Sequence, residues 1–268
     1  MDTLKLAAVG SSLLVAEEIR SIAKAFLDDW FPIRVVTTDH VRTARPDTFY
    51  LCATTQGYPL RQVVPKDRLF VFDLEPVTTF FLAIAKIPAG ETVYVFNNLL
   101  PYTEILTKRC QALGINQVTF RPIAFAEMKP GKIVERLRDA KYIIGVDAFV
   151  SENVLLSPQY RPFLRPDAVI IPGKRMATIP SACRLLAAIA DVYLDQVQKN
   201  GADPAVAEEL AQFNAYLKRA AVQLVMSQIG STQATPPDPV SVTSDASIQE
   251  QIRTLTYLRD KIRRLAAS

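Results

Sequence analysis

Short apolar runs alternate with helical patterns from residue 3 to about residue 199, and this alternation restricts the fold more than any other feature of the sequence. Most of the runs are continuously apolar, as expected for strands that are buried on both faces of a parallel sheet. The predicted strands cover residues 4–9, 33–37, 49–53, 69–72, 93–96, 117–120, 142–146 and 168–171. Strands that alternate with helices build layered folds, so we predict an α/β protein with mostly parallel sheets.

The strands fall into two sets, separated by a helical stretch over residues 77–87. This division predicts two Rossmann-like lobes, a first over residues 1–76 and a second over residues 77–199. Ligands of open α/β sheets bind outside the carboxyl ends of the strands. A cleft between the two lobes is therefore the expected place for a ligand. The amphipathic helices predicted between and after the strands cover residues 15–30, 99–113, 132–140 and 181–198.

The pattern changes after residue 199, where two helices with heptad spacing are predicted. The first covers residues 203–229, with apolar residues at alternating intervals of four and three. Residues 231–246 form a linker rich in Ser, Thr and Pro that we expect to be flexible. A capping box from Ser247 to Glu250 then opens a helix over residues 247–268. Packing on the protein's own globule and a short coiled coil both fit these helices, and the heptads favour a coiled coil that forms a homodimer.

Several classes of protein are disfavoured by composition. Cys52, Cys110 and Cys183 show no Cys-x-x-Cys spacing, which predicts buried free thiols in a reducing cytoplasm. His40 is the single histidine, so neither a histidine-based metal site nor a Ser-His triad is expected. No apolar run approaches the ~18 residues of a membrane span. Phosphate-loop and dinucleotide motifs are missing, so no cofactor, no metal and no catalytic residue is predicted.

The formal charge of +4 is concentrated near the C-terminus. The last helix carries five basic residues against Glu250 and Asp260, and we interpret this surplus as a solvated helix face. Direct binding to nucleic acid is not expected. The basic residues of this helix are Arg253, Arg259, Lys261, Arg263 and Arg264.

Polar residues follow several predicted strands at the ends where a ligand would bind. Gly10, Ser11 and Ser12 lie between the first strand and the first helix, where backbone N–H groups at the positive helix end suit a carboxylate or a phosphate. A serine at this position also serves as an ordinary N-cap. The other candidates for binding are short polar or charged residues at later strand ends: Thr54, Thr55, Asn97, Asn98, Arg121, Asp147, Lys174 and Arg175.

Two acidic residues, Asp73 and Glu75, lie at the crossing between the lobes. Paired carboxylates suit acid/base chemistry, but no histidine, metal cluster or second motif accompanies them. We expect them to cap or hinge the crossing.

From about residue 7 to residue 198 the chain resembles the N-terminal effector-sensing domains of sigma-54-dependent bacterial transcriptional activators, the group that includes the propionate-catabolism activator. Four stretches carry the resemblance: Val-Gly-Ser-Ser at 9–12, Val-Tyr-Val-Phe-Asn-Asn at 93–98, Cys-Gln-Ala-Leu-Gly-Ile at 110–115 and Ile-Pro-Gly-Lys-Arg at 171–175. The resemblance implies two Rossmann-like lobes, a small-molecule effector between them, and helices that relay occupancy to an output module.

The chain departs from this family after Lys199, where no phosphate loop and no helix-turn-helix is recognisable. It is therefore not expected to hydrolyse ATP or to read an operator in the family's way, and an output-domain protein is the expected partner. A sensor fragment, a stand-alone relative and a diverged protein all remain open. The alternatives of another class are an enzyme for a small acidic metabolite, with Asp147 or Glu75 as acid/base, and an assembly protein that binds no ligand.

Overall fold

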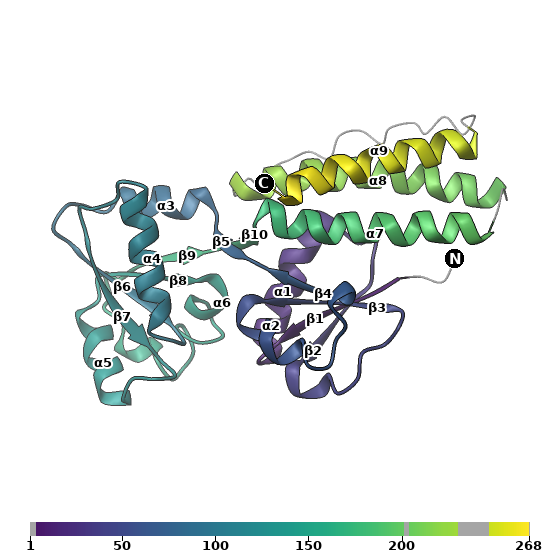
Figure 1. The fold of residues 1–268 in the computed structure, drawn as a ribbon. Helices are drawn as coiled ribbons and strands as arrows, with labels where there is room; N and C mark the ends of the chain where they lie inside the picture. The colour runs from purple at the N-terminus through teal and green to yellow at the C-terminus, as the bar shows by residue number, and fades with distance from the viewer. Residues whose placement is uncertain (1–3, 201–203, 230–246, 268) are drawn as a thin grey trace. The chain divides into compact units, whose positions relative to one another are not determined.

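The computed structural model describes residues 4–200, 204–229 and 247–267, and the chain forms two compact units. The first unit combines residues 1–75 with residues 176–268, and the second unit comprises residues 76–175. Each unit contains one four-stranded sheet in which every described strand pair is parallel. The prediction of an α/β protein with two parallel sheets and C-terminal helices is confirmed (Figure 1).

The sheet of the first unit has the order β2-β1-β3-β4. Its strands overlap the predicted runs, which are mainly apolar, as is typical of strands in a parallel sheet. Helix α1 (Leu13–Leu27) and the short helix α2 (Thr54–Leu60) follow β1 and β3. The strands are β1 (Lys5–Gly10), β2 (Ile33–Thr37), β3 (Thr48–Ala53) and β4 (Leu69–Phe72).

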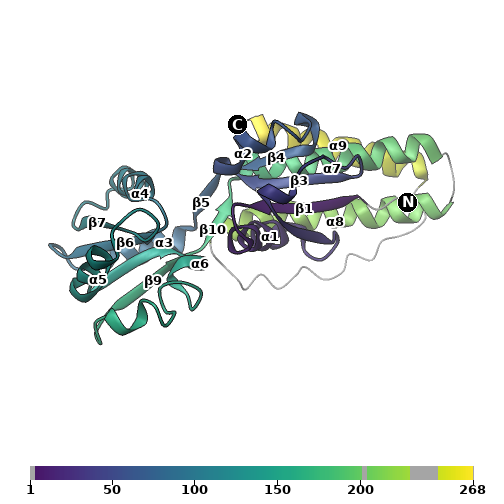
Figure 2. The ribbon, with the colours of Figure 1, turned by 90° about the horizontal axis from the view of Figure 1, so that it is seen from below.

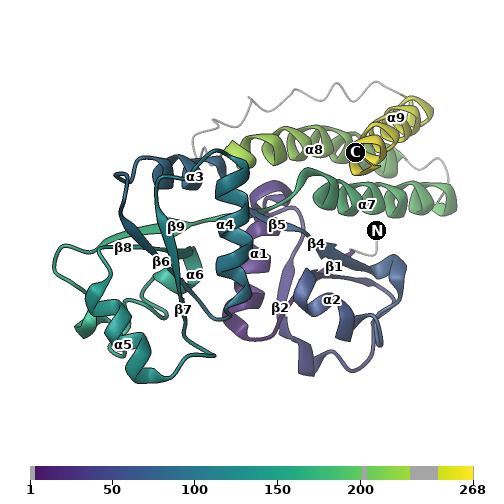
Figure 3. The ribbon, with the colours of Figure 1, turned by 60° about the vertical axis from the view of Figure 1, so that its left-hand side comes forward.

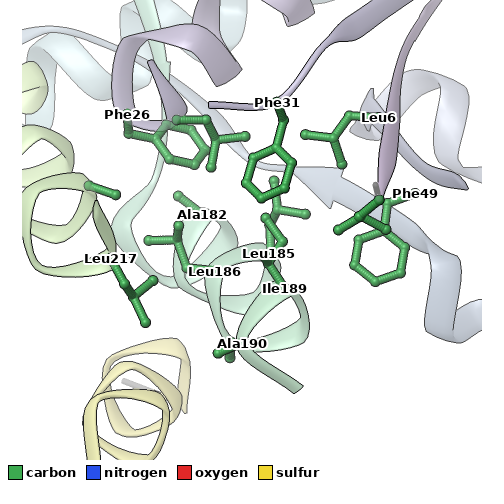
Figure 4. Close-up of a cluster of buried hydrophobic side chains, with 14 of the residues drawn as sticks. Leu6, Phe26, Phe31, Phe49, Ala182, Leu185, Leu186, Ile189, Ala190 and Leu217 are labelled. Atoms are coloured by element: carbon green, nitrogen blue, oxygen red, sulfur yellow. The ribbon is translucent and has the colours of Figure 1, made fainter. Parts of the chain in front are cut away.

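Alternate residues of β1 enter two different cores. Leu6 and Ala8 join the large cluster that includes α1 and the helices after residue 178, whereas Ala7 and Val9 join a smaller cluster with Leu60. This alternation follows from the period of two along a strand. The large cluster is drawn in Figure 4, where Phe26, Phe31 and Phe49 lie toward a group of aliphatic side chains, including Leu185, Leu186 and Ile189.

Three long helices complete the first unit and lie side by side on one face of it (Figures 1 and 2). They are α7 (Ile179–Asn200), α8 (Pro204–Ile229) and α9 (Ile248–Ala267). The second lobe was expected to extend to residue 199, but it ends at Arg175. Residues 176–199 belong to the first unit because Leu185, Leu186 and Ile189 are buried in its core.

Most apolar heptad positions of α8 and α9 are covered within the chain, although Leu265 near the end of α9 is exposed. Phe213 and Leu217 of α8, and Leu255 and Ile262 of α9, are buried in the same cluster as α1 and α7. Packing on the protein's own globule, the less favoured of our two interpretations, therefore describes these helices. The predicted linker over residues 231–246 lies outside the described residues.

The second unit has the sheet order β7-β6-β8-β9. Helices α4 and α5 contact β7, while α3 and α6 contact β9 (Figure 3). The strands are β6 (Thr92–Asn97), β7 (Thr119–Ala124), β8 (Tyr142–Val146) and β9 (Val169–Gly173). The helices are α3 (Thr78–Ala85), α4 (Pro101–Ala112), α5 (Pro130–Asp139) and α6 (Asp147–Val150).

The chain passes between the units twice, and the two passages pair as a two-stranded sheet of β5 (Leu74–Pro76) and β10 (Arg175–Ala177). Thr178 N donates a hydrogen bond of 2.8 Å to Asp73 O on the side of the first unit. Helix α7 begins directly after β10, so this pair leads into the helical layer. None of the helices in the described part of the chain is long and apolar enough to cross a membrane.

Candidate functional site

The predicted ligand-binding residues are divided between the two units. Ser11, Ser12, Thr54 and Thr55 belong to the first unit, and the remaining six belong to the second. In a parallel sheet all strands end at the same edge, so polar groups from neighbouring strands come together there.

The turn from β1 into α1 is built around Gly10. A Cβ at this position would lie 2.3 Å from Ala16 N, so only glycine lets the helix start this close to the strand. Ser12 is the N-cap of α1, and its side-chain oxygen accepts a hydrogen bond of 3.4 Å from Val15 N. Ser11 and Ser12 are both exposed. The positive end of a 15-residue helix is thus presented at the surface of the first unit.

Polar groups at the carboxyl ends of the other three strands lie along the same edge of the sheet as this turn. Gly10 pairs with Thr37 of β2, and the Thr38 hydroxyl donates a hydrogen bond of 3.1 Å to Gly10 O. On the other side, β3 ends at Ala53, and Thr54 and Thr55 follow with exposed side chains. We call this group the first carboxyl edge and define it as Ser11, Ser12, Thr38, Thr54, Thr55 and Asp73.

Asp73 adds a carboxylate to the first carboxyl edge. Its side chain accepts a hydrogen bond of 3.3 Å from the Thr54 hydroxyl and lies 3.9 Å from the Arg184 guanidinium. Asp73 is exposed, and no second carboxylate contacts it among the hydrogen bonds and ion pairs described. The edge therefore offers hydrogen-bond donors at α1 and one acceptor group beside Thr54.

Gln56 is a buried polar residue that we did not single out as a binding residue. The sequence places Thr54 and Thr55 at a strand end, and in the structure these residues open helix α2, which carries Gln56 on its buried side. Gln56 is only 8% exposed, and its Oε1 has no hydrogen-bond partner among the described residues. A buried carbonyl without a donor is costly, and this atom is shielded from the surface by the surrounding side chains.

In the second unit, the start of α4 is already capped by the chain itself. The Glu127 carboxylate accepts a hydrogen bond of 2.7 Å from Leu100 N, the N-cap residue of α4. Asn97 is buried, and its Oδ1 accepts a hydrogen bond of 2.6 Å from Asn98 N. A protein carboxylate thus occupies the place that a ligand carboxylate would take, and the Asn97 oxygen is used within its own turn.

The charged candidates of the second unit are spread over several positions. Arg121 lies within β7, opposite Tyr94, and not at the strand end where we expected it. Asp147 opens α6, Lys174 follows β9, and Arg175 is part of β10. Asp147 and Lys174 are exposed at the carboxyl end of their strands, so the second unit brings two of the four charged candidates to this edge.

Aromatic side chains fill the interior beside the carboxyl edge of the β7-β6-β8-β9 sheet. The rings of Phe96 and Phe125 are stacked with centroids 5.1 Å apart, and Tyr160 approaches Phe96 edge-on at 5.7 Å. Phe149 packs against Phe125 at 5.3 Å. The second unit thus offers Asp147 and Lys174 as exposed charged groups, while Glu127 caps the start of its helix α4.

The cysteine thiols do not suit catalysis. All three are free and buried, as predicted, and burial raises the pKa of Cys52 to about 12 and those of Cys110 and Cys183 to about 11. A thiol with such a pKa stays protonated near neutral pH, and the protonated form is a poor nucleophile. Within residues 4–200, 204–229 and 247–267, no cluster of His, Cys, Asp and Glu could hold a metal ion.

Comparison with known proteins adds no family. No family model, curated protein or solved structure matches this chain. The first carboxyl edge is therefore interpreted from its geometry alone, and the resemblance to sigma-54-dependent activators stays an expectation from sequence motifs.

Proposed function

We propose that the protein is an effector-sensing regulatory protein, which binds a small molecule at the first carboxyl edge and signals through its C-terminal helices. The observation that carries this proposal is the position of α1. Its N-terminus, at Ser12, belongs to the first carboxyl edge, and its C-terminus, at Leu27, contacts α8. One rigid helix of about 22 Å thus connects the proposed binding site to the helical layer.

The effector that fits this edge carries an acidic group and a hydroxyl or amide. The N-terminus of α1 favours a carboxylate or phosphate through its partial positive charge and its backbone N–H groups. Asp73 repels an anion but accepts a hydrogen bond from a hydroxyl, and Thr54 both donates and accepts. An effector with its acid at Ser12 and its polar group toward Thr54 uses both features.

The relay from α1 to α8 depends on a compact aromatic contact. The Tyr216 hydroxyl donates a hydrogen bond of 2.9 Å to Leu27 O, and the Trp30 ring stacks on the Tyr216 ring with centroids 4.6 Å apart. Tyr193 of α7 stacks on Phe213 of α8 at 3.7 Å and accepts a hydrogen bond from Trp30 Nε1. Packed aromatic groups of this kind transmit small displacements because interiors are dense and resist compression.

The output of this relay is proposed to be control of bacterial transcription through a partner protein. The resemblance to sigma-54-dependent activators supports this part of the proposal. A homodimer formed through the C-terminal helices would use their exposed faces, since most of the apolar heptad positions are buried within the chain.

A thermal-shift screen against small organic acids, sugar phosphates and nucleotides tests the proposal, because a ligand that binds the folded state raises Tm. The decisive variant is Ser12→Asp, which keeps an N-cap but places a carboxylate where the effector's acid would bind. Ser247→Asp makes the same change at the start of α9 and serves as the control. We expect a hit that is lost in Ser12→Asp and kept in Ser247→Asp.

A hit that survives in Ser12→Asp would place the ligand elsewhere on the protein and contradict the proposed site. A complete absence of hits, with both variants as stable as the wild type, would contradict the proposal of an anionic effector.

A further inference from the structure

The outer face of α9 carries basic residues at helical spacing. Leu255 and Ile262 are buried and fix the opposite face of this helix on α7 and α8. Residues spaced by three and four lie on one side of a helix. Such a row of exposed residues, which we call the α9 outer stripe, consists of Arg253, Tyr257, Lys261 and Arg264.

Not all basic residues of α9 are available to another molecule. Arg259 and Arg263 form ion pairs with Asp191 of α7 at 3.4 Å and 2.6 Å. Arg253, Lys261 and Arg264 form no ion pair with any residue that the structure describes. The helix thus uses two of its cations to hold α7 and leaves three cations on the outer stripe.

An aromatic ring lies between these cations. Tyr257 is 61% exposed, and Lys261 Nζ lies 5.5 Å from the centroid of its ring. Leu265, which is 48% exposed, adds apolar surface one residue after Arg264. The stripe therefore combines positive charge with apolar area, and aromatic and arginine residues are those most enriched at protein interfaces.

The chemistry of this stripe fits a protein better than a nucleic acid. Glu250 lies on the same side of the helix, so this surface is not uniformly positive, and Asp260, beside the stripe, is paired with Arg259 at 2.9 Å. A nucleic acid carries a phosphate at every nucleotide, whereas a partner helix can place its carboxylates opposite the cations and away from Glu250. A phosphate backbone also offers no apolar group that would pack against the exposed Leu265. Carboxylates with apolar residues between them would match the cations, Tyr257 and Leu265 together.

We propose that the α9 outer stripe is the docking site for an acidic amphipathic helix of a partner protein. From Arg253 to Arg264 the stripe is about 17 Å long, which corresponds to about three turns of a partner helix. The partner would place carboxylates at intervals of three or four residues. This inference names the chemistry of the output partner and rests on the proposed function for its biological meaning, but the docking itself requires no effector.

Fluorescence anisotropy with the full chain tests the docking site. The probe is a labelled peptide of about 18 residues made of Glu, Leu and Ala, with Glu at every third or fourth position. Wild-type protein should bind it, and added NaCl should weaken the binding because salt screens exposed charges. The variant R253E/K261E/R264E should bind at least about tenfold more weakly.

The matched control is K86E/K129E/K132E, which changes the same number of charges on exposed lysines of the second unit. Circular dichroism should show that both variants keep the helix content of the wild type.

The proposal is wrong if the wild type does not bind the peptide, or if both triple variants lose affinity equally. Tighter binding of a mixed-sequence DNA duplex than of the peptide would also overturn it, in favour of a nucleic-acid surface. None of these results depends on an effector, so they are separate from the thermal-shift screen.

Discussion

The hydroxyl of Tyr216 donates a hydrogen bond of 2.9 Å to the backbone oxygen of Leu27, a residue 189 positions earlier in the chain. Leu27 ends α1, and the last carbonyls of a helix have no partner within it. Tyr216 is only 3% exposed, so this bond forms away from water. The C-terminal helix α8 thus completes the hydrogen bonding of a helix in the sheet layer, which joins the two layers of the first unit.

Replacing Tyr216 with Phe should lower the free energy of unfolding by about 1 kcal/mol, since the ring contact stays and only the hydrogen bond is lost. Urea denaturation followed by circular dichroism measures this change. Tyr58→Phe is the control, because Tyr58 is 76% exposed and its hydroxyl has no hydrogen bond among those described. Equal stability of Tyr216→Phe and wild type would show that water replaces the lost donor at Leu27.

Gly10→Ala should strongly destabilise the first unit. The new Cβ would lie 2.3 Å from Ala16 N and 2.8 Å from Ser12 O, and both are backbone atoms that cannot rotate away. We expect a loss of about 3 kcal/mol or more, as for overpacked core sites. Gly131→Ala is the matched control, because its Cβ would meet no atom within 4 Å at the start of α5. A Tm for Gly10→Ala within about 1 °C of the wild type would contradict the close approach of strand and helix.

The polar pair between α8 and α9 should be replaceable by two apolar residues. Asn214 is 3% exposed and donates from Nδ2 to Gln251 Oε1 at 2.9 Å, but its own Oδ1 has no partner among the described residues. Asn214→Leu alone should cost about 1–2 kcal/mol because Gln251 loses its donor. Adding Gln251→Leu should recover most of this loss. A double variant less stable than Asn214→Leu in urea denaturation would contradict this.

Stability should fall as the pH rises above about 9. Burial raises the pKa of Cys52 to about 12 and those of Cys110 and Cys183 to about 11, from a reference value of 9.0. Between about pH 9 and these raised pKa values, the unfolded chain releases thiol protons that the folded chain keeps, so the unfolded state gains stability. The buried thiols thus favour folding fully below about pH 9, and this contribution is lost as the pH rises through 11 to 12.

Urea denaturation at about pH 7 and about pH 10 measures this loss. Cys52→Ala should reduce the decline, because it removes the group whose pKa is raised most. An equal decline in the variant and the wild type would assign the pH dependence to other groups, of which Tyr216 and Tyr193, with pKa values raised mainly by burial, are the first candidates.

The strands over residues 33–37, 69–72 and 142–146 match the sequence prediction at both ends. Residues 69–72 and 142–146 are continuous apolar runs, and the run over 33–37 is apolar apart from Arg34 and Thr37. The strand predicted over 117–120 instead covers Thr119–Ala124. Arg121 and Pro122 interrupt its apolar pattern, but β7 lies at the edge of its sheet, where a polar side chain and a proline are tolerated. The extent of β7 therefore depends on its position in the sheet, and a local sequence pattern does not contain that position.

The candidate site was only partly predictable. Local motifs identified Ser11 and Ser12 at the start of α1, because an N-cap after a strand is a local signal. Gln56 was not recognised, since its importance comes from burial without a partner, which only packing produces. Nor did the sequence show that Glu127, 27 residues after Leu100, caps α4 and occupies the start of that helix.

The sequence alone identified the main strands and the long helices, because hydrophobic period and end signals act over a few residues. It did not show the short helices α2 and α6. It also determined that α8 and α9 each bury one apolar side. The tertiary structure decided what covers that side. The same heptad spacing allows a helix to pack against a second chain or against the chain's own α1 and α7, and here it packs within the chain. The tertiary structure also decided which strand-end groups are free, because a polar side chain is available to a ligand only where no other part of the fold has taken its hydrogen bonds.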